Sequence, residues 1–157
     1  MTFEVRSTAF EEGEMIPPQY TCDGENISPP FVWESIPDGT ESLALLLEDI
    51  DSVEGIWSHW VVFNIPANVK TLAEALPPKA SFLWGGEQGR NDFDALGYGG
   101  PCPSDGKTHR YVARLYALDT PLGLNPGATR EDVLAEMDGH IIESAELMAR
   151  YMRLSDR

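Results

Sequence analysis

Short apolar or alternating runs, separated by clusters of proline, glycine and aspartate, make up most of the chain. The runs fall near residues 3–10, 31–33, 42–48, 59–65 and 110–118. Each run has the length of a β-strand, and strands at this spacing with turn residues between them are typical of an antiparallel sandwich. The pattern therefore predicts an all-β fold.

Only the C-terminal part of the chain has a pattern that indicates a helix. Thr129 precedes Asp132 by three residues, which is the spacing of a capping box, and acidic side chains here suit the positive end of the helix dipole. Apolar residues then recur near helical spacing at Val133, Met137, Ile141, Met148 and Met152. The sequence thus predicts an antiparallel β-sandwich carrying a C-terminal α-helix, whose apolar stripe packs against the sandwich.

The stretch from residue 70 to residue 91 is rich in proline and glycine and predicts a long surface loop, with a short helical turn at 72–76. Trp84 within it is expected to pack on the sandwich or to line a site, because an exposed indole is costly. No linker or repeat interrupts the chain. Its length predicts a single domain over residues 1–157, large enough for its own core.

The charge balance limits the classes of partner. The chain has 11 basic and 26 acidic side chains, for a formal net charge of -15. This charge disfavours binding to the phosphates of nucleic acids and to anionic membranes. No apolar run is long enough to span a bilayer, and the N-terminus lacks the basic start and apolar stretch of a secretory signal. We therefore expect a cytoplasmic protein without stable membrane insertion.

Candidate chemistry is concentrated in residues 97–111, GYGGPCPSDGKTHRY, immediately before a clear strand. Glycine lets a ligand approach the main chain without a Cβ in the way, and backbone N–H groups exposed in such loops bind small anions. His109 and Tyr111 follow at the start of the strand, where alternate side chains share one face. The segment indicates an anion-binding loop beside an imidazole and a phenol.

A second polar block lies upstream. Asp49 and Asp51 come shortly before His59, which heads another apolar run. Alternation predicts that the two carboxylates share one face, so that they converge with the histidines and the phenol. Arg110 is expected to point to the opposite face of its strand and to hold a carboxylate.

Both blocks resemble the signature sequences of the phosphatidylethanolamine-binding protein family, in the bacterial and archaeal branch often called Raf-kinase-inhibitor-like. The family's first block is an Asp-Pro-Asp turn followed by a strand that opens with histidine. Its second block reads roughly Gly-Tyr-x-Gly-Pro-x-Pro and then His-Arg-Tyr. The matching residues are Asp49, Asp51, His59, Gly97, Tyr98, Gly100, Pro101, Pro103, His109, Arg110 and Tyr111. The similarity also covers residues 22–30, Trp33 and the rest of the chain. Ile50 departs from it by replacing the proline, which frees φ at that turn.

The resemblance implies a pocket for a small anion, either phosphate or a phospholipid headgroup. Its ligand-binding residues would be Asp49, Asp51, His59, Gly100, Pro101, Pro103, His109 and Tyr111. The histidines and the tyrosine hydroxyl would donate to anion oxygens. Asp49 would orient a histidine, or accept from a ligand amine or a protonated phosphate oxygen. The Gly100 backbone and the two prolines would form the rim. The blocks also bring Cys22 and Cys102 near the pocket. A disulfide between them and two unrelated thiols are both compatible with the sequence.

Other chemistries fit the spacing less well. The Asp-x-Asp pair fails the EF-hand pattern at Val53, Glu54 and Trp60, and the scattered histidines and cysteines do not form a zinc motif. Ser58 points away from His59 if their strand alternates regularly, and no Gly-x-Ser-x-Gly elbow occurs. We therefore expect neither metal nor cofactor, and a hydrolase is the less favoured function. Inhibition of a partner kinase or protease through the surface around the pocket is the main alternative, and a homodimer stays open.

Overall fold

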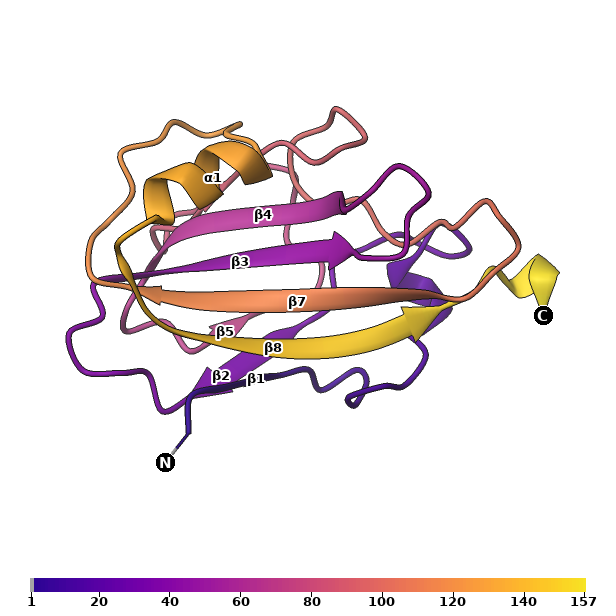
Figure 1. Ribbon diagram of the computed structural model, residues 1–157, viewed down its shortest axis with the longest axis horizontal. Coiled ribbons are helices and arrows are strands. Elements are labelled where there is room, and N and C mark those ends of the chain that lie inside the picture. The colour runs from indigo at the N-terminus through magenta and orange to yellow at the C-terminus, as the bar shows by residue number, and fades with distance from the viewer. Residues whose placement is uncertain (1) are drawn as a thin grey trace.

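A computed structural model describes residues 2–157 as two antiparallel β-sheets with one short helix (Figure 1). The larger sheet has the spatial order β6 (Glu87–Gln88), β4 (Trp57–Pro66), β3 (Ser42–Asp49), β7 (His109–Leu118) and β8 (Ile141–Tyr151). The smaller sheet has the order β1 (Glu4–Arg6), β2 (Phe31–Glu34) and β5 (Thr71–Leu72). The helix α1 spans Arg130–Met137, and short 3-10 turns lie at Pro18–Tyr20 and Leu154–Asp156. The predicted fold class is confirmed.

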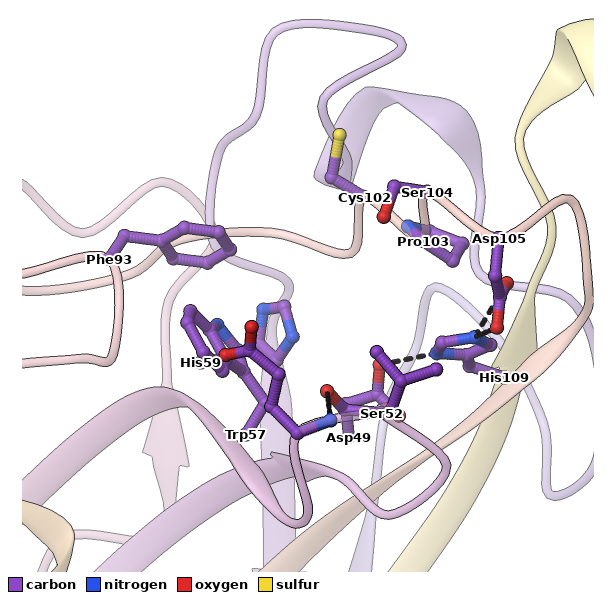
Figure 2. A pocket seen from close by; sticks show the side chains of 12 residues that line it. Asp49, Ser52, Trp57, His59, Phe93, Cys102, Pro103, Ser104, Asp105 and His109 are labelled. Atoms are coloured by element: carbon purple, nitrogen blue, oxygen red, sulfur yellow. Dashed lines mark hydrogen bonds and ion pairs between the residues drawn. The ribbon is translucent and has the colours of Figure 1, made fainter.

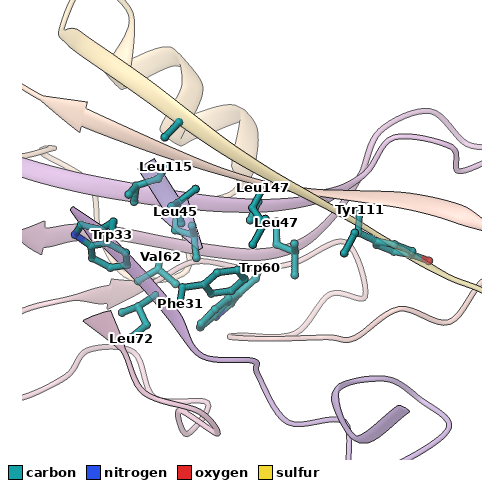
Figure 3. Packing of buried hydrophobic residues seen from close by; sticks show 14 of the residues in the cluster. Phe31, Trp33, Leu45, Leu47, Trp60, Val62, Leu72, Tyr111, Leu115 and Leu147 are labelled. Carbon is teal, nitrogen blue, oxygen red and sulfur yellow. The ribbon is translucent and has the colours of Figure 1, made fainter. Parts of the chain in front are cut away.

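The main core lies between the two sheets (Figure 3). The period of two along β3 sends Leu43, Leu45 and Leu47 to this side, where they are almost fully buried. Phe31 and Trp33 of β2 face them from the smaller sheet. β3 is the central strand of the larger sheet, so its inward residues pack between the neighbouring strands and under the smaller sheet. Its C-terminal end is hydrogen-bonded to both β4 and β7.

Helix α1 covers the opposite face of the larger sheet. Val133 and Met137 are completely buried there against Leu46 and other apolar residues of β3 and β4. The predicted capping box is present: Thr129 Oγ1 accepts from the Asp132 backbone N–H at 3.2 Å, and Asp132 Oδ2 accepts from the Thr129 backbone N–H at 3.0 Å. The start of the helix is therefore confirmed.

The predicted extension of this helix to residue 152 is wrong. The helix ends at Met137, Gly139 takes a left-handed φ of +82°, and the chain then forms β8, which pairs with β7 along its length. Alternate residues of β8, such as Leu147 and Tyr151, are buried, whereas Ile141 is 45% exposed. Strand pairing overrides the helical spacing of a few apolar residues here, because every second side chain can enter the core.

Residues 70–91 also differ from the prediction. They contain β5 and β6, and no helical turn forms at 72–76. Trp84 does not line the pocket described below; its ring stacks on Phe82 with centroids 4.9 Å apart and remains 36% exposed. Residues 2–157 include no helix with the length and apolar character that a membrane crossing requires.

Candidate functional site

The predicted site residues meet where β3 ends and β7 begins. The register places Asp49 opposite Tyr111 on one side and opposite Trp57 on the other. A cavity of about 210 Å³ opens at this edge of the sheet (Figure 2). Its lining residues are Asp49, Ser52, Val53, Glu54, Trp57, His59, Phe93, Cys102, Pro103, Ser104, Asp105 and His109.

His109 lies between two carboxylates, Asp49 and Asp105 (Figure 2). Its Nδ1 is 2.6 Å from Asp49 Oδ2, and its Nε2 is 2.9 Å from both oxygens of Asp105. Burial alone would lower the pKa of His109, but the hydrogen bonds with Asp49 and Asp105 outweigh it and raise that pKa. An ionised carboxylate only accepts, so both ring nitrogens donate and the ring is an imidazolium.

His59 reaches the pocket through a β-bulge. The β3–β4 register shifts between the Leu47–Trp60 pair and the Glu48–Ser58 pair, which leaves His59 as the extra residue. A bulge redirects side chains locally, so that His59 and Trp60 both lie on the inner side of the sheet. Regular alternation along β4 would have separated them.

The His59 ring is held in one tautomer. Its Nδ1 lies 2.6 Å from the carbonyl oxygen of Gly99, which can only accept, so Nδ1 carries the proton. Burial lowers the pKa of His59, and the ring is therefore neutral near pH 7. In the neutral ring Nε2 is an acceptor, and it becomes the predicted donor only when the ring takes up a proton.

Tyr111 packs between the two histidines. Its ring meets His59 edge to face with centroids 5.3 Å apart, and stacks on His109 at 6.4 Å. Burial, reinforced by the Asp49 carboxylate, raises the pKa of its hydroxyl, so the hydroxyl keeps its proton. Among residues 2–157 this buried hydroxyl has no hydrogen-bond partner, and neither does the indole N–H of Trp57. Trp57 lines the cavity, whereas Tyr111 is not among the residues that line it.

Asp51 does not join this group, which corrects its predicted place beside Asp49. It accepts from the backbone N–H and Nε of Arg110 at 2.9 Å and from Nη2 at 2.8 Å. The Arg110 guanidinium lowers the pKa of Asp51 to about 2. The alternation fails because the strand ends at Asp49, where the Ile50 N–H donates to the Arg110 carbonyl at 3.1 Å. The prediction for Arg110 is confirmed.

The predicted rim is only partly present. Pro103 lines the cavity, whereas Gly100 and Pro101 do not. The Gly100 N–H donates to Asn26 Oδ1 at 2.9 Å, so it is not free for an anion. A Cβ on Gly100 would lie 2.3 Å from the Tyr20 carbonyl oxygen, which shows that this glycine is needed for backbone packing.

Of the two alternatives left open for the cysteines, the structure has the disulfide. Cys22 and Cys102 are bonded, with their Cα atoms 5.5 Å apart. The bond joins the loop after the first 3-10 turn to the pocket wall, because Cys102 lines the cavity. Next to it, Asp23 accepts from Arg153 at 2.8 Å and thereby holds the C-terminal segment beside the same loop.

Several pocket residues were missed by the sequence reasoning. Asp105 lies four residues before His109 within the segment already singled out, so its acidic side chain was the available signal. Phe93 meets both Trp57 and His59 edge to face, with centroids 5.6 and 5.3 Å apart. Nothing in the local pattern around Phe93 marked it, because residues 70–91 and their continuation appeared as an unstructured loop.

Known proteins resemble this chain over almost its whole length. A sequence profile described as phosphatidylethanolamine-binding protein matches residues 6–152. The chain belongs to that family. The curated relatives of this family member include a UPF0098 protein of Methanothermobacter thermautotrophicus, 49% identical, with 95% of this chain and 98% of the relative covered. A UPF0098 protein of Aquifex aeolicus is 46% identical, with 96% and 88% covered.

Two crystal structures of phosphatidylethanolamine-binding protein relatives have the same fold. The homologue CT736 from Chlamydia trachomatis is 39% identical and superimposes with a TM-score of 0.88, covering 97% of this chain and 98% of its own. YbcL of E. coli, described as a new member of the mammalian family, is 32% identical with a TM-score of 0.90, and 98% and 99% of the two chains are covered.

Proposed function

We propose that this family member binds a small ligand with anionic oxygens, either phosphate or a phospholipid headgroup, in the cavity beside His59 and His109. The observation that carries the proposal is the buried indole N–H of Trp57, which lines the cavity and has no hydrogen-bond partner among residues 2–157. A buried donor without a partner costs about 1–3 kcal/mol. A ligand oxygen that accepts from this N–H recovers that cost.

The charges around the cavity restrict the form of the ligand. Asp49, Glu54 and Asp105 line it together with one imidazolium, His109. This balance disfavours a bare dianion and favours a monoanion or a zwitterion whose cation faces a carboxylate. The neutral Nε2 of His59 accepts from a protonated phosphate oxygen or an ammonium group, and once the ring takes up a proton Nε2 donates to an anionic oxygen instead. With a net charge of -15 on the chain, affinity for free phosphate is expected to be on the order of millimolar.

Histidine NMR tests the proposal directly. Phosphate and phosphoethanolamine are each titrated into the protein while the ring resonances of all three histidines are followed. His59 and His109 should shift with the same saturation curve. His140 is an internal control, because it pairs with Asp119 at the opposite end of β7. If neither pocket histidine shifts while the fold stays intact, the cavity is not an anion site.

We propose binding without turnover. Ser58, the serine next to His59, pairs with Glu48 on the outer side of the sheet, and the sulfur of Cys102 is in a disulfide. Neither is therefore available as a nucleophile beside His59. Hydrolysis of a phosphate or acyl ester that disappears in His59→Ala would overturn this part of the proposal.

Inhibition of a partner kinase or protease is the second candidate function. Val53 is 83% exposed and Phe93 47% exposed, and both line the cavity from its rim. Exposed apolar side chains grouped around a pocket favour contact with another protein. Here the surface and not the cavity would bind, so inhibition of a purified kinase or protease should survive in His59→Ala and fall in Val53→Asp. Loss in both variants would tie the inhibition to the cavity.

A further inference from the structure

The turn formed by residues 104–108 stands out beside the cavity. All five residues are exposed, although Pro103 before them and His109 after them are buried. Among residues 2–157, this turn makes no backbone-to-backbone hydrogen bond with the rest of the fold. Ser104 and Asp105 of the turn line the cavity, and the side chain of Asp105 also accepts from the Lys107 N–H at 3.1 Å within the turn. The ion pair of Asp105 with His109 is the hydrogen-bonded link between this turn and the pocket.

That ion pair occupies the ring nitrogen through which His109 would bind a ligand. Nδ1 of His109 is held from β3 by Asp49, whose carboxylate is almost fully buried. Nε2 is the outward donor, and both oxygens of Asp105 accept from it. The Asp105 side chain is more exposed than that of Asp49, 23% against 6%. Of the two carboxylates, Asp105 is therefore the one that can leave without opening the sheet.

We propose that Asp105 is an internal competitor for the pocket: its carboxylate holds the 104–108 turn against His109, and an anionic ligand oxygen binds by displacing it. This inference rests on the proposed function and specifies how the site selects its ligand. A phosphate group offers the imidazolium more acceptor oxygens than a single carboxylate does, but it must also overcome repulsion from Asp49 and from the displaced Asp105. A ligand that carries an ammonium group can pair with the displaced carboxylate.

The two ligand sources thus respond differently when the carboxylate is removed. In Asp105→Asn the shape of the side chain is kept while its charge and one strong acceptor are lost. Inorganic phosphate should then bind roughly 10-fold to 100-fold more tightly, the range set by losing one charge-assisted hydrogen bond. Phosphoethanolamine should gain less, because the variant also loses the partner of the ammonium group.

The experiment measures both affinities by NMR titration at pH 7 in the wild type and in two variants. Asp119→Asn is the matched control: it removes a carboxylate that pairs with a histidine, His140, at the far end of β7. It makes the same change in net charge as Asp105→Asn, but at a position away from the cavity. Its affinities for both ligands should therefore equal those of the wild type. A larger gain for phosphate than for phosphoethanolamine, confined to Asp105→Asn, supports the proposal.

Other outcomes separate this proposal from the function on which it rests. Asp105→Asn could bind phosphate no more tightly than the wild type, while phosphate shifts the His59 and His109 resonances in both proteins. The cavity would then be an anion site, and Asp105 would not be a competitor for it. If neither protein binds either ligand, the proposed function and the competition both fail. Equal gains in Asp105→Asn and Asp119→Asn would assign the effect to net charge and overturn the role of Asp105.

Discussion

His59 of β4 and Tyr111 of β7 meet edge to face, with ring centroids 5.3 Å apart and planes at 74°, although β3 lies between their strands. The contact is possible because β3 ends at Asp49 and because the bulge in β4 turns His59 inward. The imidazole is thereby placed against the ring of a buried tyrosine, while His59 itself lines the cavity.

The affinity for phosphate should increase as the pH falls. Burial lowers the pKa of His59, so the free ring is neutral near pH 7, whereas a bound anion favours the protonated ring. Binding therefore takes up a proton, and affinity weakens as the pH rises through the neutral range. His59→Ala should bind phosphate more weakly by about 1–3 kcal/mol.

Titrations at several pH values check this prediction. Phosphate itself ionises in the same range, but this change affects both proteins equally. The difference in affinity between wild type and His59→Ala therefore isolates the histidine. A difference that does not change between pH ~5 and ~8 would contradict proton uptake by His59.

The strands were predictable from the sequence where a long apolar run is also buried in the core. The apolar runs at 42–48, 59–65 and 110–118 became β3, β4 and β7, the strands that carry the core. β8 was not predictable in this way. Its apolar residues fit a period of two and a period near 3.6, and pairing with β7, which no local pattern reveals, decides between them.

Within the site, Asp49, His109 and Tyr111 were predictable because regular strands and the family resemblance both point to them. His59 was predictable from the resemblance, but the bulge that turns it inward was not. The misplaced residue, Asp51, lies beyond the end of its strand, where alternation no longer holds. The misplaced glycine, Gly100, is required for packing against the backbone of the 3-10 turn, a long-range contact. Turn geometry and long-range contacts are therefore what the sequence alone could not supply.

The His109–Asp105 ion pair should stabilise the fold at intermediate pH and lose this effect both at higher and at lower pH. The pKa of His109 is raised in the fold, so its contribution is present below about pH 6.5 and is lost as the pH rises through the folded-state pKa. The Asp105 pKa is lowered, first by its hydrogen bond with His109, so its contribution is present above about pH 3.9 and is lost as the pH falls through the lowered pKa. The pair stabilises the fold most between these two values.

Thermal unfolding of wild type and Asp105→Asn across this range measures the effect. The difference in Tm between the two proteins should be largest near pH ~5 to ~6, where both members of the ion pair are charged. It should shrink above neutrality, where His109 loses its proton. Asp119→Asn, whose partner His140 is half exposed, should show a smaller difference at every pH. A constant difference for Asp105→Asn would mean that His109 is not its titrating partner.

The Cys22–Cys102 disulfide should contribute strongly to stability. It closes a loop with a sequence separation of 80 residues. In the chain-entropy model, a loop of this length corresponds to about 4–5 kcal/mol, which is an upper estimate. Unfolding in urea with and without reductant gives the change, and mass spectrometry of the non-reduced protein checks the bond. Two free thiols in air, or unchanged unfolding on reduction, would contradict this prediction.

The boundary between α1 and β8 can be tested with two apolar truncations. Met137→Ala removes a completely buried side chain from the end of the helix and should destabilise the fold by about 2–5 kcal/mol. Ile141→Ala truncates a side chain that is 45% exposed and should cost less than about 1 kcal/mol. Equal costs in urea unfolding would indicate a continuous packed helix through Ile141 and would contradict the strand.

Gly100→Ala should disturb the loop that positions His59. The added Cβ would lie 2.2 Å from Asn26 Oδ1 and 2.3 Å from the Tyr20 carbonyl oxygen, and backbone at that distance must move. Overpacking of this kind costs about 1–3 kcal/mol or more. The neighbouring Gly99 carbonyl, which accepts from His59 Nδ1, would move as well. We therefore expect both a lower free energy of unfolding and an altered His59 resonance.

Gly123→Ala is the matched control for this change, because no heavy atom lies within 4 Å of the Cβ that it adds. Its φ lies outside the left-handed region, so its cost should stay within about 0.5 kcal/mol. Urea unfolding compares the two variants, and the histidine spectrum reports on the pocket. If Gly100→Ala unfolds like Gly123→Ala and leaves the His59 signal unchanged, then the close packing at Gly100 does not hold the Gly99 carbonyl in place. The tautomer of His59 would in that case need another support.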